Sequence, residues 1–105
     1  MDPKTVQGHR DEVQVLDVRE DEEWDAGRIE GARHIPLGQL SARLGELDRD
    51  RPVVTVCRSG GRASKATELL TQAGWTAQTK SGGMTQWADD GLPLTTADGS
   101  PGRVA

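Results

Sequence analysis

One stretch of the sequence decides the fold: Val53-Val54-Thr55-Val56-Cys57-Arg58-Ser59-Gly60-Gly61-Arg62. Its β-branched residues predict a buried strand, and apolar residues at helical spacing from 63 to 73 predict a helix directly after the loop. The loop holds the only cysteine of the chain, with an arginine on each side of the two glycines. Backbone N–H groups at a helix N-terminus and nearby positive charge both stabilise a thiolate and bind anions. The stretch therefore predicts a nucleophilic Cys57 thiolate that faces an anionic substrate.

The composition limits the class of protein. A chain of 105 residues is long enough for one domain with one core. The formal net charge is −4, and acidic residues gather at 20–25 and 46–50, so we expect no nucleic-acid partner. One cysteine makes no intramolecular disulfide, and the sequence shows neither a secretory signal pattern nor a segment long enough to span a membrane. We therefore expect a cytoplasmic protein that does not bind a membrane.

Further elements are expected before the central stretch. Residues 13–18 predict a strand covered on both faces, and residues 19–24 predict a short helix with an acidic first turn. Residues 31–36 predict a short strand, and residues 5–7 predict a short edge strand. A second helix is predicted by leucines at helical spacing, namely Leu37, Leu40, Leu44 and Leu47.

After the central stretch, residues 75–79 predict a strand, and a last short helix carries Met84 and Trp87. Residues 96–105 have no periodicity and predict a flexible C-terminal tail, which leaves a domain at residues 5–95. Strands that alternate with helices predict an α/β fold with a mainly parallel sheet, in which sites form beyond the carboxyl ends of the strands. Cys57 is placed at such an end.

Four groups of residues occur in order along the chain: Leu16-Asp17-Val18-Arg19, Trp24 to Pro36, Cys57 to Ser64, and Gly82-Gly83-Met84 to Pro93. In this order they resemble the single-domain rhodaneses, which are thiosulfate sulfurtransferase-type domains. The resemblance covers residues 6–94 and implies a parallel central sheet flanked by helices on both faces. Two positions depart from the family pattern, because family members often have His at the position of Arg28 and Asn at that of His34.

The resemblance implies a reaction. The Cys57 thiolate attacks the outer sulfur of thiosulfate, sulfite leaves, and the enzyme becomes a persulfide. Cyanide or a thiol, as the thiophilic acceptor, then removes the terminal sulfur. The reaction implied by the family uses no metal and no organic cofactor.

Roles for the loop residues follow from their chemistry. Arg58 and Arg62 are expected to hold the sulfonate-like end of the donor through their guanidinium groups, Arg62 more directly than Arg58. Gly60 and Gly61 are expected to let backbone N–H groups turn toward the sulfur. Ser59 either donates a hydroxyl hydrogen bond to the persulfide or shapes the turn.

Three residues outside the loop are candidate supporting residues. Asp17 and Arg19 lie at the end of the first central strand, where they are expected to approach the active loop, and we expect a structural ion pair rather than catalysis. The resemblance places the segment with Met84 beside the pocket, with Met84 at its entrance.

Two other functions remain open. Phosphatases that resemble this fold have arginine six residues after the cysteine, whereas this chain has Ala63 there, so the shorter loop favours a single sulfur over a phosphate. A small phosphatase or arsenate reductase is therefore the weaker alternative. The domain is alternatively a sulfur carrier that receives sulfur from a partner protein in a sulfur relay, with thiosulfate as a laboratory donor only.

Overall fold

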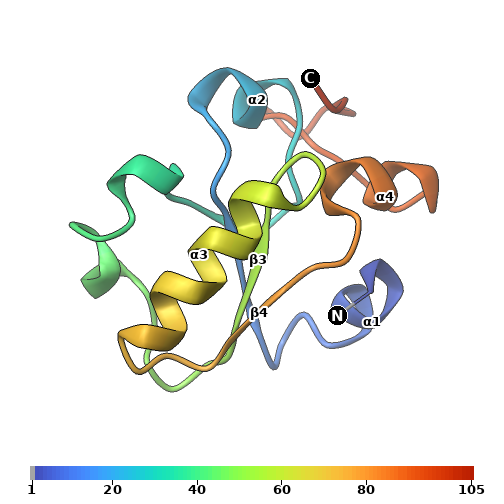
Figure 1. The fold of residues 1–105 in the computed structure, drawn as a ribbon. Coiled ribbons are helices and arrows are strands. Elements are labelled where there is room, and N and C mark those ends of the chain that lie inside the picture. The colour runs from blue at the N-terminus through green and yellow to red at the C-terminus, as the bar shows by residue number, and fades with distance from the viewer. Residues whose placement is uncertain (1) are drawn as a thin grey trace.

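The computed structural model describes residues 2–105 (Figure 1). Its centre is a sheet of four parallel strands in the order β2-β1-β3-β4. The strands are β1 Gln14–Asp17, β2 Arg33–His34, β3 Val53–Val56 and β4 Ala77–Thr79. The α/β class and the parallel sheet predicted from the sequence are confirmed.

Helices cover both faces of the sheet, and each face has its own apolar cluster. On one face α3 (Gly61–Gln72) packs on Leu16 and Val53. On the other face α1 (Pro3–Gly8) and α4 (Gly83–Asp89) cover Val15 and Val54 (Figure 1). Neighbouring residues of one strand thus belong to opposite clusters, because side chains alternate across a strand. This alternation explains why both central strands are buried along their whole length and carry apolar residues on both faces.

The expected edge strand at residues 5–7 is wrong, because this segment belongs to helix α1. Asp2 caps the helix, since its Oδ1 accepts a hydrogen bond of 2.8 Å from the N–H of Thr5. Pro3 occupies the first turn, where its missing N–H costs nothing. Val6 is fully buried in the cluster under α4, so tertiary packing keeps one turn and a half of helix in place.

The helix predicted from the four leucines is also wrong. The segment forms two separate 3₁₀ turns, η1 Leu37–Gln39 and η2 Leu44–Glu46. Each turn contains a glycine, Gly38 or Gly45, and glycine lowers helix stability by about 1 kcal/mol relative to alanine. Leu40 and Leu47 are nevertheless buried under α3, so the leucines reach the core without a continuous helix.

Helix α2 (Asp21–Ala26) ends at Gly27, as the sequence predicted, and lies beside the C-terminal segment. The N–H of Arg103 donates to the carbonyl of Ala26 at 2.9 Å, and Arg28 and Thr95 exchange two backbone hydrogen bonds. Residues 96–105, expected to be flexible, thus have a defined path in the structure, while their mobility stays a prediction. No helix within residues 2–105 is long and apolar enough to cross a membrane.

Candidate active site

Strand β3 delivers Cys57 to the carboxyl edge of the sheet. The residue is 1% exposed, and its Sγ accepts hydrogen bonds from the N–H groups of Gly60 at 3.0 Å and Ala63 at 3.4 Å. Helix α3 begins at Gly61, so the N–H of Ala63 belongs to its first turn, where no helical carbonyl is available as a partner. The sulfur therefore takes the place of a capping side chain at the positive end of the helix dipole.

The two loop glycines have different roles. Gly60 has a φ of +128°, which L-residues rarely adopt, so only glycine turns the chain here without strain. Gly61 has no positive φ and is simply the first residue of α3. The expectation that both glycines are needed to aim N–H groups at the sulfur is therefore met only at Gly60. A Cβ at either position would meet no atom within 4 Å, so the space beside the loop is open.

The arginines also differ. We expected Arg62 to be the more direct substrate ligand, but its guanidinium forms a two-point ion pair with Glu23 of α2, at 2.6 and 2.9 Å. This hydrogen bonding lowers the pKa of Glu23 to about 2 and raises that of Arg62. Arg58 is exposed, and its Nε donates to the carbonyl of Ala105 at 3.1 Å. Ser59 is exposed as well.

Glu23 is a residue that the sequence interpretation missed, because the sequence pattern assigns it only to the acidic first turn of a short helix. The signal was present as the pair Glu20 and Glu23, three residues apart at a helix start, which is the spacing of a capping box. The Glu23 carboxylate accepts the N–H of Glu20 at 3.0 Å and also holds Arg62. One side chain therefore caps α2 and ties it to the start of α3.

Replacing Glu23 with glutamine is expected to lower the free energy of unfolding by about 1 kcal/mol, since a partly exposed two-point ion pair becomes a neutral contact. The loss should be present above pH 4.5 and shrink as the pH falls toward 2, because the lowered pKa stabilises the fold only while Glu23 is ionised. Urea unfolding of E23Q, R62Q and the double variant measures the coupling. The exposed neighbour Glu22→Gln is the control, and a coupling of zero would contradict the role assigned to the pair.

Asp17 and Arg19 form the structural ion pair expected from the sequence. Both are fully buried, and the guanidinium of Arg19 meets the Asp17 carboxylate at 2.8 to 3.0 Å. Arg19 also donates to the carbonyl of Gly27 at 2.8 Å. The pair therefore connects the end of β1 to the end of α2.

Helix α4 supports the loop from the other side. The N–H of Met84 donates to the carbonyl of Cys57 at 2.7 Å, and Thr85 donates its N–H and its hydroxyl to the carbonyl of Arg58. The Met84 side chain does not line an entrance as the resemblance implied, because it is fully buried in the cluster with Val54 and Trp87. Met84 instead holds the loop through its backbone.

Lys80, at the end of β4, is a second residue that the sequence interpretation missed. It is fully buried, its Nζ donates to the carbonyl of Gly83, and the same Nζ lies 5.7 Å from the Trp87 ring centre. Burial lowers its pKa to about 8, although the charges of Asp90 and Cys57 act in the opposite direction. No motif surrounds Lys80, so only the tertiary structure identifies it as a buried cation near the thiol.

The burial of Lys80 predicts a pH dependence of stability. The unfolded chain holds this proton up to about pH 10.5 and the folded chain only up to about pH 8, so stability should rise between these values. Lys80→Met should raise the free energy of unfolding at pH 7 by about 1–3 kcal/mol. This stabilisation should be lost at pH 10.5. Urea unfolding at both pH values tests this, with the exposed Lys65→Met as the control. A difference in the free energy of unfolding between Lys80→Met and the wild type that is the same at both pH values would contradict the prediction.

The two positions that depart from the family pattern lie together. His34 stacks on Trp24 with ring centres 4.7 Å apart, and Arg28 lies over the same ring at 4.5 Å. His34 also donates through Nε2 to the carbonyl of Arg19 at 2.8 Å. Arg28 and His34 thus belong to one stack around Trp24, and both are distant from Cys57 in the sequence.

Comparisons with known proteins agree with this geometry. The model of the rhodanese-like domain matches residues 2–90. The chain belongs to this family. A sulfurtransferase of Allochromatium vinosum is 34% identical over 90 residues, which cover 85% of this chain and 84% of that protein. Thiosulfate sulfurtransferase 16 of Arabidopsis thaliana is 36% identical over 102 residues, covering 82% of this chain and 79% of the relative.

The rhodanese fold is equally clear from solved structures. A rhodanese-related protein of Thermoplasma volcanium superposes with a TM-score of 0.87 at 29% identity, covering 90% of this chain and 95% of the other. The domain also resembles part of a longer protein, YrkF of Bacillus subtilis, a candidate sulfur carrier protein. The two are 36% identical over 60% of this chain, and the match covers 34% of YrkF. This rhodanese-like domain is therefore related to sulfurtransferases.

Proposed function

We propose that this rhodanese-like domain transfers sulfane sulfur from thiosulfate, or a similar anionic donor, to a thiophilic acceptor through a persulfide on Cys57. The observation that carries the proposal is the pair of N–H groups, from Gly60 and Ala63, that donate to the Cys57 sulfur. Two such donors at a helix N-terminus stabilise a negative sulfur, whether it is the thiolate or the terminal sulfur that replaces it.

In the first step the Cys57 thiolate attacks the outer sulfur of thiosulfate. A bond forms between the two sulfur atoms, the bond from the outer sulfur to the sulfonate sulfur breaks, and sulfite leaves with that electron pair. Arg58 is the charged side chain of the loop that makes no ion pair with an Asp or Glu side chain within residues 2–105, so we assign it to the sulfonate group of the donor. Arg62 acts through its ion pair with Glu23 and keeps positive charge beside the loop.

In the second step cyanide or a thiolate attacks the terminal sulfur. The bond between the two sulfur atoms breaks, and the Cys57 thiolate is restored as the leaving group. Each step is a displacement at sulfur, in which a sulfur or cyanide carbon lone pair forms the new bond and the leaving group takes the old pair, so the proposal requires neither a metal nor an organic cofactor.

The deciding experiment is intact mass spectrometry of the protein after incubation with thiosulfate. We expect the mass to rise by one sulfur atom, and to return to its starting value when cyanide is added, with thiocyanate as the product. A mass that stays constant with thiosulfate and with other sulfane donors would overturn the proposal. Phosphate release from an aryl phosphate would favour the phosphatase alternative instead.

The likeness to the candidate sulfur carrier YrkF favours a second function, in which a partner protein supplies the sulfur. The same Cys57 persulfide would then form by transfer from a persulfidated donor protein, such as a cysteine desulfurase. Comparing the Michaelis constant for thiosulfate with turnover by that donor protein distinguishes the two functions. Fast loading by the protein together with a very high constant for thiosulfate would identify a carrier.

A further inference from the structure

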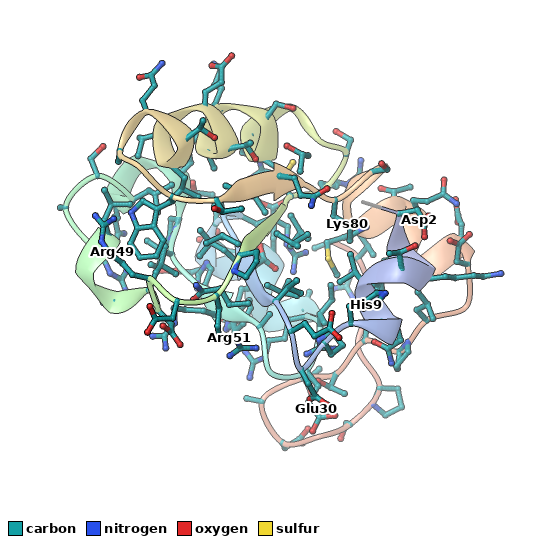
Figure 2. The ribbon with its side chains drawn as sticks, turned by 90° about the horizontal axis from the view of Figure 1, so that it is seen from below. Asp2, His9, Glu30, Arg49, Arg51 and Lys80 are labelled. Atoms are coloured by element: carbon teal, nitrogen blue, oxygen red, sulfur yellow. The ribbon has the colours of Figure 1, made fainter. Side chains whose placement is uncertain are left out.

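A cavity of about 400 Å³ lies at the amino-terminal ends of β1 and β2. Cys57 lies at the carboxyl ends of the parallel strands, so the cavity is at the opposite end of the sheet. Figure 2 views the molecule from the side of this cavity, with Arg51 labelled. The cavity therefore plays no part in the chemistry at Cys57.

Positive charge dominates the wall of this cavity. Three arginines line it, Arg10, Arg33 and Arg51, whereas Asp48 is its only lining carboxylate among residues 2–105. Cations outnumber carboxylates by three to one among the lining residues, while the charges of Glu30 and Asp11 also act on Arg10, and Arg33 acts on Glu46. Positive charge gathered in a concave site of an acidic protein attracts anions to that place.

These guanidinium groups retain unused binding capacity. Arg51 donates from Nη2 to the carbonyl of Val13 at 2.5 Å, but its Nε is buried and has no hydrogen-bond partner within residues 2–105. Arg33 is exposed, and its guanidinium makes no hydrogen bond or ion pair with any described residue. Arg10 donates to the carbonyl of Glu30, a neutral acceptor, and burial lowers its pKa. The Nε of Arg51 is enclosed, so the exposed guanidinium of Arg33 is the more accessible donor for an anion in the cavity.

The wall is held in place from the sheet. The Gln14 side chain donates to the carbonyls of Asp48 and Arg51, and accepts the N–H of Asp48 at 3.1 Å. This fixes the loop that carries Arg51. Gly31 lies against Arg10, because a Cβ there would come within 2.9 Å of the Arg10 Nη2. The arginines therefore line a prepared site, which lowers the entropy cost of binding.

The lining also has an apolar part, formed by Val13, Val15 and Ala32. An inorganic ion would leave this part unused. A phosphate monoester carries close to two negative charges at neutral pH, and its oxygens fit guanidinium forks. Its organic group would contact the valines.

We propose that this cavity binds a small organic phosphate, with the phosphate group held by the three arginines and the organic group packed against the valines. The site is independent of the sulfur chemistry proposed for Cys57. A carboxylate of the same size carries one charge less and binds more weakly.

The test uses phenyl phosphate as the probe and the full chain carrying Cys57→Ser, which removes any reaction at the thiol. Two-dimensional NMR at constant ionic strength should show saturable shifts of the Gly31 and Ala32 amides. Arg33→Gln should raise the dissociation constant at least about tenfold, since a charge-assisted two-point contact is lost. The matched control is Arg49→Gln, which removes one charge from the same loop region, where Arg49 lies over Trp75 at 4.7 Å.

Four results would overturn the proposal. These are the absence of saturable shifts, shifts that appear at residues 57–62 instead of 31–32, equal weakening by Arg33→Gln and Arg49→Gln, and equal binding of benzoate. The third would show a general charge effect, and the last would show that two negative charges are not required. Arg33 is exposed, so its replacement is not expected to disturb the fold, and the thermal midpoint of the variant verifies this.

Discussion

Cys57→Ser is expected to lose sulfur transfer entirely while it keeps its fold. The rate with thiosulfate and cyanide should fall at least about 10³-fold, because a serine oxygen at this position forms no persulfide. The fold should survive, since the serine Oγ can accept the same N–H groups of Gly60 and Ala63 that donate to the Cys57 sulfur. We expect a loss of stability of about 1 kcal/mol, as is usual for a buried isosteric change.

The measurements are thiocyanate formation, intact mass after thiosulfate, and urea unfolding of both proteins. Ser64→Ala, on the exposed side of α3, is the control for a small change in the same region and should keep the parent rate. Residual turnover above a few per cent in Cys57→Ser would show that the reaction does not pass through this sulfur. Loss of turnover together with loss of the fold would leave Cys57 a structural role only, and the urea curves separate these outcomes.

Gly83→Ala is expected to have the largest effect on stability outside the thiol. Gly83 has a φ of +59°, and a Cβ there would overlap the carbonyl of Arg58 and lie 2.5 Å from that of Cys57. The first turn of α4 would have to move, which breaks the hydrogen bond from Met84 to Cys57 and those from Thr85 to Arg58. We expect a loss of about 3–5 kcal/mol from backbone strain and steric overlap together.

Activity should fall with stability in this variant, because the loop loses the helix that fixes its carbonyls. Gly91→Ala is a closely matched control, since Gly91 has a φ of +75° but a Cβ there would meet no atom within 4 Å. That variant should lose only about 1–2 kcal/mol, the cost of the left-handed backbone for an L-residue. Equal urea midpoints for Gly83→Ala and Gly91→Ala would show that the close contact of Gly83 with the loop carbonyls does not affect stability.

Much of the fold followed from local patterns. The strands β1 and β3 were predictable because they are buried on both faces and therefore rich in β-branched and other apolar residues. Helix α3 was predictable from its apolar spacing. The two wrong elements, at residues 5–7 and 37–47, are short segments whose conformation depends on one cap or one glycine together with packing on the sheet.

The candidate site divides in the same way. Cys57 and its loop were apparent because the strand, the glycine and the helix are consecutive in the sequence. The partners of the loop are distant in sequence, since Glu23 is 39 residues from Arg62. Lys80 and the cavity lined by three arginines had no local signal at all.

The sequence by itself determined the α/β class, the family resemblance and the place of the one thiol at the end of a central strand, because these depend on neighbouring residues and on side-chain periodicity. The tertiary structure alone decided which charges are free. Arg62 is paired with Glu23, Arg58 makes no ion pair with an Asp or Glu side chain within residues 2–105, and Lys80 is enclosed near Trp87. The physical reason is that burial and ion pairing depend on which distant segments the parallel sheet brings together.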